Sequence, residues 1–433
     1  MNRQETPLGI MPSHWRISKV REEALQVTDF VANGSFASLR ENVAYKDTED
    51  YAVLIRQVDY NNHFSGPFVF VDKHAYDFLA KSQLHGGEII ISNVGNVGIV
   101  FRCPKLKYHM ALAPNVIMVK FKGDDGFYHY WFRSPLGQQS LHAIESGSAQ
   151  PKFNKTSFKD LCIPVPPIEE QRKIAAVLGA LDDKIENNRK ICANLEAQAQ
   201  AIFKSWFVDF EPFGGKMPQG WKMGKLGDVV ESMLNGDWGK DTPDGKNDSP
   251  VYCIRGADIP DVVCGSKGKM PLRYILPKNY EAKQLSNGDI VIEISGGSPT
   301  QSTGRAALIT DSLLERYDRG MVCTNFCKAV KPRDGFSFLF YNYWRYLYDK
   351  GVFFQYENGT TGIKNLDIGT VFAEQNIVVP VAGALDKFTD IVSANFNLTC
   401  KLGLENEKLA AMRDALLPKL MSGEIDVEKV KVA

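Results

Sequence analysis

The most constraining feature of the chain is a long, uninterrupted helical pattern at residues 168–210. Mostly apolar positions recur there at alternating steps of four and three, from Ile174 and Leu178 onward to Trp206. This heptad spacing keeps one stripe of a helix facing a partner helix. A run of prolines that ends at Pro167 marks a sharp start, because proline cannot lie inside a helix. At about 1.5 Å per residue, roughly 40 residues make a rod of about 60 Å, which predicts a spacer between two domains.

Length and composition narrow the class of protein. A chain of 433 residues is too long for one hydrophobic core, so two or three domains are expected. Lys+Arg and Asp+Glu both number 51, so any contact with nucleic acid relies on local patches. The 8 cysteines form no CxxC pair, which disfavours a zinc site, and scattered thiols fit a reducing cytoplasm. With no signal peptide at the N-terminus and no apolar run of about 18 residues, we expect a cytoplasmic, soluble protein.

Five patterns occur twice along the chain, in the same order. They are a tryptophan between a proline and basic residues, a glycine turn before an apolar strand, a glycine-rich loop that ends in lysine, a proline-containing strand, and a long heptad helix. The paired segments are 12–20 and 218–226, 84–92 and 285–293, 147–152 and 359–364, 163–166 and 377–380, and 168–210 and roughly 385–420. Five matches in one order indicate an internal repeat.

The repeat predicts the order domain, helix, domain, helix. We expect domain 1 at 1–165, a central spacer helix at 166–215, domain 2 at 216–382, and a second spacer helix with a tail at 383–433. Short apolar runs predict strands, and two helical segments interrupt them, so the fold class is α+β with two mixed α/β domains. The predicted strands are 51–57, 88–94, 115–121, 251–255, 290–295 and 327–330, and the predicted helices are 126–133 and 336–348.

The two long helices carry compatible seams and are separated by a whole domain. An antiparallel coiled coil with a pseudo-twofold relation between the halves buries both seams most simply. Asn188, Asn395 and Glu405 are polar seam positions that favour one register. The alternative is that each helix packs on its own domain as an ordinary amphipathic helix. The predicted seam comprises Ile174, Leu178, Leu181, Ile185, Asn188, Leu195, Ile202, Leu398, Leu402, Leu409, Met412 and Leu416.

No catalytic motif stands out in the sequence. There is no phosphate-binding GxxxxGK[ST] loop, no GxGxxG after a strand, no HExxH and no GxSxG. The 7 histidines all lie in the first half, so histidine is not a catalytic group that both halves share. Asp289 and Glu293 faintly resemble the carboxylate pair of a metal-dependent nuclease, but the accompanying lysine is missing. We therefore predict no catalytic residue, no bound metal and no cofactor in this chain.

Both halves do contain small, polar loops beside isolated basic residues. Such loops let backbone N–H groups approach phosphates, while Asn, Gln, Arg and Lys can read base edges in the major groove. The alternative is that they are plain turns with solvated lysines. The predicted DNA-binding residues are Ser92, Asn93, Asn96, Lys152, Asn154, Lys155, Ser298, Gln301, Arg305, Thr361 and Lys364.

Four stretches resemble the DNA specificity subunit of type I restriction-modification systems. They are the openings around Trp15 and Trp221, the helix entrance Pro-Val-Pro-Pro-Ile-Glu-Glu-Gln-Arg-Lys-Ile-Ala at 164–175, and the tail around Leu-Leu-Pro-Lys-Leu-Met-Ser-Gly-Glu-Ile at 416–425. The second helix entrance lacks the Glu-Gln-Arg signature, which leaves its start near Leu385 open.

The resemblance implies a specific division of labour. Each domain is expected to read one half of a bipartite DNA sequence, the helix pair to set the gap, and two methyltransferase subunits to dock on the helices, with restriction and translocase subunits joining through them. S-adenosylmethionine, ATP and magnesium then serve the partners, where base flipping and adenine methylation occur. The rival interpretations are a self-contained nuclease or methyltransferase and a coiled-coil scaffold that joins two small-ligand domains.

Overall fold

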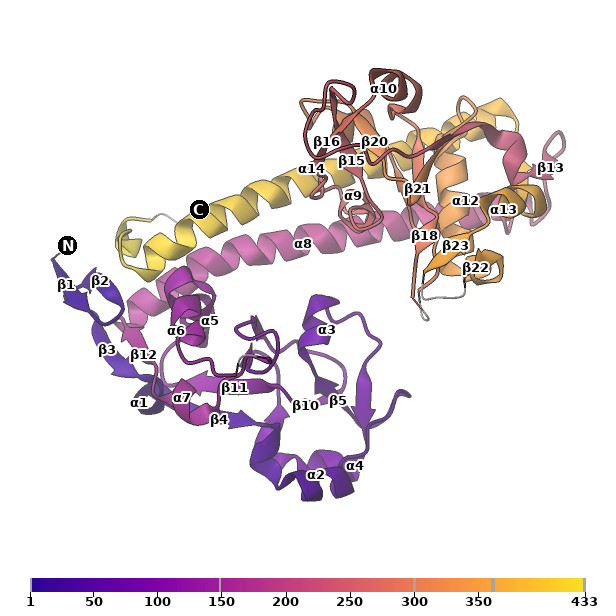
Figure 1. The fold of residues 1–433 in the computed structure, drawn as a ribbon. Coiled ribbons are helices and arrows are strands. Elements are labelled where there is room, and N and C mark those ends of the chain that lie inside the picture. The colour runs from indigo at the N-terminus through magenta and orange to yellow at the C-terminus, as the bar shows by residue number, and fades with distance from the viewer. Residues whose placement is uncertain (1, 148, 299–300, 360–362, 431–433) are drawn as a thin grey trace. The chain divides into compact units, whose positions relative to one another are not determined.

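The computed structural model describes residues 2–147, 149–298, 301–359 and 363–430. The chain forms two compact units: unit 1 comprises Met1–Asp183 and Ala410–Ala433, and unit 2 comprises Lys184–Leu409. Each unit contains one mixed α/β domain together with part of both long helices, α8 (Ile168–Phe207) and α14 (Ala382–Met421) (Figure 1).

Unit 1 is built on two four-stranded sheets. The first has the strand order β4-β11-β8-β9 and is antiparallel, and the second has the order β6-β5-β10-β7, with β5 and β10 parallel. The second sheet and its short helices are called lobe 1. The strands are β4 (Ala24–Asp29), β11 (Val116–Phe121), β8 (Ile89–Ser92), β9 (Val100–Arg102), β6 (Val69–Val71), β5 (Ala52–Ile55), β10 (His109–Leu112) and β7 (Gln83–Leu84). The helices of lobe 1 are α2 (Phe36–Asn42), α3 (Gln57–Asn61) and α4 (Lys73–Phe78).

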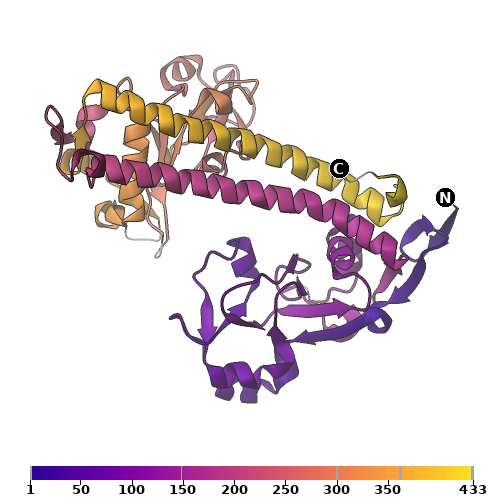
Figure 2. The same cartoon turned by 180° about the vertical axis from the view of Figure 1, so that it is seen from behind.

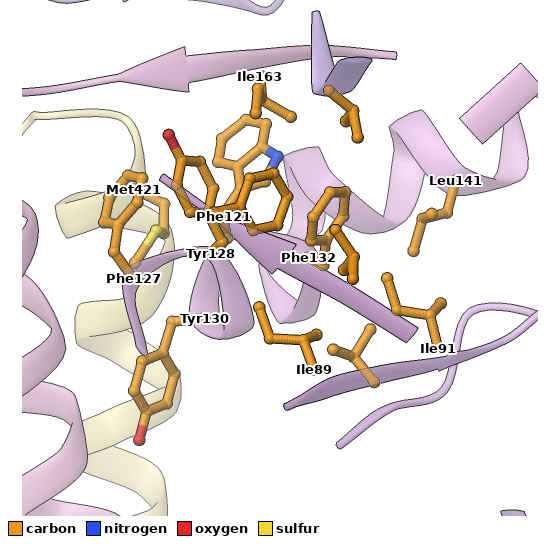
Figure 3. Close-up of a cluster of buried hydrophobic side chains, with 14 of the residues drawn as sticks. Ile89, Ile91, Phe121, Phe127, Tyr128, Tyr130, Phe132, Leu141, Ile163 and Met421 are labelled. Carbon is orange, nitrogen blue, oxygen red and sulfur yellow. The ribbon is translucent and has the colours of Figure 1, made fainter. Parts of the chain in front are cut away.

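The main core of unit 1 lies where the first sheet meets the helices α5 (Asp125–Arg133) and α6 (Pro135–His142). Asp124 begins α5 by accepting a hydrogen bond from the Phe127 N–H at 2.9 Å, which satisfies one of the free donors at a helix start. Figure 3 shows the cluster and Tyr130, which points out of it. The labelled members are Ile89, Ile91, Phe121, Phe127, Tyr128, Tyr130, Phe132, Leu141, Ile163 and Met421.

The entrance of α8 is tied to the start of the chain. Trp15 is 1% exposed, and its indole Nε1 donates to both carboxylate oxygens of Glu170 at 3.1 Å. The Gln171 amide accepts from the Asp124 N–H at 2.9 Å and donates to the Pro166 carbonyl at 2.8 Å. Buried polar groups need such partners. The Glu-Gln pair of the helix entrance is therefore a structural bracket that joins Trp15, α5 and α8.

Unit 2 also contains a four-stranded antiparallel sheet and a smaller mixed sheet, which has three strands where lobe 1 has four. Its antiparallel sheet has the order β14-β21-β17-β19, and lobe 2 has the order β16-β15-β20, with β15 and β20 parallel. The strands are β14 (Val230–Asn235), β21 (Cys327–Pro332), β17 (Ile290–Glu293), β19 (Ala306–Leu308), β16 (Leu272–Ile275), β15 (Ser249–Ile254) and β20 (Met321–Cys323). The helices α9 (Ile259–Val263) and α10 (Pro277–Lys283) belong to lobe 2, and α12 (Ser337–Asp349) covers the antiparallel sheet.

A strand pair closes each domain next to a long helix. In unit 1 the pair is β3 (Arg16–Lys19) with β12 (Cys162–Val165), and in unit 2 it is β13 (Lys222–Lys225) with β24 (Asn376–Val379), both antiparallel. All six predicted strands and both predicted domain helices are confirmed in these units.

Within unit 2 the two long helices run antiparallel and side by side, as both views show (Figures 1 and 2). Asn188 Nδ2 donates to Glu405 Oε2 at 2.8 Å and to Asn406 Oδ1 at 2.9 Å, while Asn395 Nδ2 donates to the Leu195 carbonyl at 3.2 Å. The contact positions thus rise on one helix as they fall on the other. Asn188 is completely buried. The second helix begins at Ala382, three residues before the expected Leu385.

The predicted seam needs one correction on α14. Leu398 is 42% exposed and Met412 is 53% exposed, so neither lies in a helix interface. Asn395, Thr399 and Asn406 face α8 or the cavity beside it instead. The prediction failed because it assigned α14 a single partner. Phe388, Val392 and Phe396 also pack in the domain core of unit 2, and this packing turns the apolar face of α14 by about one position.

Among the described residues, no helix is long and apolar enough to cross a membrane.

Candidate nucleic-acid interface

In unit 1 the structure brings two predicted loops together. The loop after β8 pairs with the glycine-rich loop that ends at Lys152, through a bridge between Val94 and Lys152. The Phe153 N–H donates to the Asn93 carbonyl at 3.0 Å, and the Gly95 N–H donates to the Pro151 carbonyl at 2.9 Å. We call the described residues of these segments, 93–98, 146–147 and 149–155, loop cluster 1. Backbone bonds therefore hold two segments that are far apart in sequence side by side.

Several predicted DNA-binding residues in unit 1 hold this cluster in shape. Ser92 is completely buried; its hydroxyl donates to the Asn96 carbonyl at 2.6 Å and accepts from the Ile99 N–H at 2.9 Å. The Asn93 amide donates to the Phe153 carbonyl at 3.1 Å. Asn154 begins α7 (Lys155–Lys159) by accepting from the Ser157 N–H at 2.9 Å. These polar side chains form hydrogen bonds within the protein, although Asn154 is itself exposed.

The basic residues of loop cluster 1 differ in what they contact. Lys155 Nζ lies 2.8 Å from the Asp29 carboxylate, so its charge is already balanced. Lys152 is exposed, and within the described residues it forms no ion pair. Asn96 is also exposed. Lys152 and Asn96 are therefore the predicted residues of unit 1 that face solvent with their polar ends available.

Unit 2 contains a corresponding cluster. The strand β18 (Ser295–Gly296) pairs with β23 (Lys364–Leu366), which also pairs with β22 (Glu357–Asn358). We call the described residues 295–298, 301–305, 357–359 and 363–366 loop cluster 2. Ser298 Oγ accepts from the Gln301 N–H at 3.0 Å, and the Gln301 side chain is exposed. Thr361, which was predicted to bind DNA, lies outside the described residues.

Two buried carboxylates balance the cations of loop cluster 2. Arg305 donates from Nε and Nη2 to Glu293 at 2.8 and 2.7 Å, a two-bond fork that raises the pKa of Arg305. Lys364 Nζ lies 2.7 Å from Glu357, whose other oxygen accepts from both the N–H and the hydroxyl of Thr303. Glu293 is 5% exposed, as expected for a strand-end group that anchors an arginine. Within the described residues, no group of three His, Cys, Asp or Glu side chains could hold a metal ion.

Both units share an arginine–aspartate pair that was not among the predicted residues. Arg56 follows β5 and donates to Asp59 from Nε and Nη2 at 3.1 and 2.6 Å. Arg255 follows β15 and donates to Asp258 in the same way, at 2.8 and 3.0 Å. Each aspartate is 2% exposed. The signal was present in the sequence, since Ile-Arg-x-x-Asp occurs at 55–59 and again at 254–258.

Two cavities in unit 2 bear on the small-ligand interpretation. One touches Gly265, Arg316 and Cys400, the other touches Cys192 and Glu196, and each measures about 20 Å³. A space of this size holds about one water molecule, whereas sites for small organic ligands measure several hundred Å³. These cavities offer no room for such a ligand.

Comparisons with known proteins agree with this architecture. Residues 26–197 match the family model described as the type I restriction modification DNA specificity domain. The type I restriction enzyme MjaIX specificity subunit of Methanocaldococcus jannaschii is 24% identical over 99% of this chain and 97% of its own length. The HindI specificity subunit of Haemophilus influenzae is 25% identical over 64% of this chain and 71% of its own length.

A solved structure agrees at the level of the fold. The S subunit of a type I restriction-modification system from M. genitalium superposes with a TM-score of 0.50 at 15% identity, covering 94% of this chain and 96% of that one. Residues 26–197 thus resemble a type I specificity domain, and the chain is similar, over nearly its whole length, to a type I specificity subunit. This confirms the resemblance predicted from the helix entrance and the tail. The relatives are named as specificity subunits, not as methyltransferases or nucleases.

Proposed function

We propose that this chain is the non-catalytic DNA-recognition subunit of a type I restriction-modification complex, in which each unit reads one half of a bipartite target. The observation that carries the proposal is the repeated placement of loop clusters 1 and 2. In each unit, the turn after the central apolar strand pairs with the glycine-rich loop that ends in lysine. Two equivalent polar surfaces fit a target that has two half-sites.

The loop clusters suit DNA in different ways. In loop cluster 1, Lys152 offers an unpaired positive charge to a phosphate, and Asn96 offers an amide to a base edge. In loop cluster 2, Gln301 offers an amide, while Arg305 and Lys364 are held in place by Glu293 and Glu357. A held arginine loses little side-chain entropy when it contacts a base, which favours specificity over non-specific attraction.

The helices serve as the spacer in this proposal. An antiparallel coiled coil of α8 and α14, with the halves related by a pseudo-twofold axis, sets the unread gap between the half-sites. The completely buried Asn188 donates to Glu405 and Asn406. A shift in register breaks these bonds and leaves buried polar groups unpaired, which costs about 1–3 kcal/mol per group. Asn188 therefore favours one length of spacer.

Two methyltransferase subunits dock on the helices, and restriction and translocase subunits join through them. The support is an outward apolar stripe on α14, where Ile391 and Leu398 are each 42% exposed and Met412 is 53% exposed, at multiples of seven residues. S-adenosylmethionine, ATP and magnesium bind to these partners, which flip and methylate the target adenine. We place the complex in the cytoplasm, where free thiols such as the eight here remain reduced.

Docking is tested by charging the stripe. Leu398→Glu together with Ile391→Glu places two carboxylates on an apolar contact and is expected to weaken binding of the methyltransferase subunit at least tenfold, measured by co-purification and calorimetry. Lys401→Glu is the matched control, because Lys401 is exposed on the same helix. Equal binding by the double variant and the control contradicts docking at this stripe.

A further inference from the structure

Lobe 2 approaches α14 so closely that only glycine fits on both sides. A Cβ atom added to Gly403 of α14 would lie 2.1 Å from the Gly265 carbonyl, and a Cβ added to Gly265 would lie 2.1 Å from the Thr399 carbonyl. Gly265 also has a φ of +76°, which disfavours other residues. Glycine inside a helix costs about 1 kcal/mol relative to alanine. The contact between the two backbones explains why α14 carries glycine at this position.

A carboxylate one turn further along α14 fastens the same loop. Glu407 accepts from the Ser266 hydroxyl at 2.8 Å and from the Lys267 N–H at 2.8 Å, and Arg316 Nη2 lies 2.5 Å from its second oxygen. Arg316 Nη1 donates to the Gly265 carbonyl at 2.6 Å, and the Arg316 side chain is 11% exposed. Lobe 2 thus supplies two hydrogen-bond donors and one ion-pair cation to one helix carboxylate beside the glycine contact. We call this set, residues 265–267, 316, 403 and 407, the clamp.

Unit 2 therefore holds its domain to the long helices at two places. At the domain base, Asn342 of α12 accepts from the Gln200 amide at 2.9 Å, and Arg345 pairs with Glu196 at 2.8 Å. The clamp is the second place, and it belongs to lobe 2. Attachment at one place permits a pivot, whereas attachment at two places does not. Lobe 2 cannot tilt against α14 while both attachments are intact.

We propose that the clamp fixes the position of the second half-site along the DNA, so that Gly403, Arg316 and Glu407 are positioning residues for gap length. The inference rests on the proposed function, in which unit 2 reads one half-site. Successive base pairs are about 3.4 Å apart, so a tilt of the unit 2 domain about its base that displaces loop cluster 2 by a few ångströms spans one base pair. With the clamp intact, the complex binds poorly to DNA whose gap differs by one base pair. With the clamp released, it binds such DNA as well, and the half-site sequences that it recognises do not change.

The experiment uses the complex reconstituted with its methyltransferase subunits. Methylation profiling of the wild-type complex first establishes the target and its gap. Binding is then measured on probes whose gap is one base pair shorter, correct, or one base pair longer. For the variant Arg316→Gln with Glu407→Gln, we expect the ratio of affinities for the correct and the altered gaps to fall roughly tenfold, equivalent to about 1.4 kcal/mol. The conservative variant Arg316→Lys, which keeps a cation beside the intact Glu407, is expected to retain most of it.

The control is Glu186→Gln with Arg189→Gln, which removes an exposed ion pair on α8 of the same unit, with a separation of 4.0 Å. This control is expected to keep full gap discrimination. Unchanged discrimination in the released variant, with the wild-type melting temperature retained, overturns the clamp and leaves the proposed function standing. If Arg316→Gln with Glu407→Gln fails to fold, Glu407→Gln alone takes its place in the same assay. A wild-type complex that shows no bipartite selection overturns both proposals.

Discussion

In unit 2, lobe 2 reaches α14 through the Gly265–Gly403 contact and through two hydrogen bonds and one ion pair to Glu407. In unit 1, the contacts described above to the helix residues come from the start of the chain and from α5. There, the helices are held by Trp15 and by α5, whose Tyr130 donates to Asp182 at 2.8 Å. The same strand order is thus attached to its helices in two different ways. Similar topology does not imply similar restraint, because restraint depends on a few contacts that each sequence supplies separately.

The largest expected effect contrasts two helix glycines. In α8, a Cβ on Gly179 meets no atom within 4 Å, so Gly179→Ala is expected to stabilise the protein by about 0.5–1 kcal/mol through helix propensity. In α14, Gly403→Ala forces its Cβ into the Gly265 backbone and is expected to destabilise unit 2 by about 1–3 kcal/mol. Urea unfolding of the full chain measures both changes. A stabilising Gly403→Ala contradicts the close contact.

Acid is expected to destabilise unit 1 more than unit 2. Burial, together with the charge of Arg133, lowers the pKa of His129 to about 3, from an ordinary value of 6.5. In the unfolded chain, His129 becomes protonated below about pH 6.5, whereas in folded unit 1 it stays neutral until about pH 3. The free energy of unfolding of unit 1 therefore falls as the pH is lowered across this window. His129→Gln is expected to move the acid unfolding of unit 1 to lower pH, measured by amide hydrogen exchange.

The comparison with unit 2 provides the control for the acid experiment. All seven histidines lie in unit 1, so unit 2 has no corresponding loss from histidine protonation. Exposed His63 is the matched substitution, and His63→Gln is expected to leave the acid unfolding of unit 1 unchanged. Equal acid profiles for His129→Gln and the wild type contradict the assigned role of His129.

The smallest expected effect concerns the lysines of the two loop clusters. Lys152→Ala removes an unpaired charge and is expected to reduce the slope of log affinity against log salt by about 1. Lys364→Ala is expected to change it less, because Glu357 already balances Lys364. Salt titrations of the assembled complex on its target DNA measure both slopes. A larger change in the salt slope for Lys364→Ala than for Lys152→Ala contradicts the assignment of Lys152 as the lysine that contacts a phosphate.

Much of the fold could be predicted because local patterns agreed with the final structure. The prolines before Ile168 and the apolar runs at β8, β11, β17 and β21 determine helix start and strands without help from distant residues. Loop pairing was also within reach, since the repeated order placed two polar loops in each half. These features depend on neighbours in sequence.

The rest depended on contacts that a sequence pattern does not encode. Leu398 and Met412 fit the heptad, but α14 must also pack Phe388 and Val392 in the domain core, and its apolar face turns accordingly. Ser92 looked like a surface serine, but its neighbours bury it completely. Gly403 is informative only in retrospect, since a helix glycine gains its meaning from the backbone placed against it.

The central claim is that each unit reads its own half-site, and domain exchange tests it most directly. Residues 216–382 are replaced by the corresponding domain of another specificity subunit, and genomic adenine methylation is profiled in cells that carry the complex. The account predicts that one half of the methylated sequence changes while the other half and the gap remain. A target in which both halves change, or neither does, contradicts it.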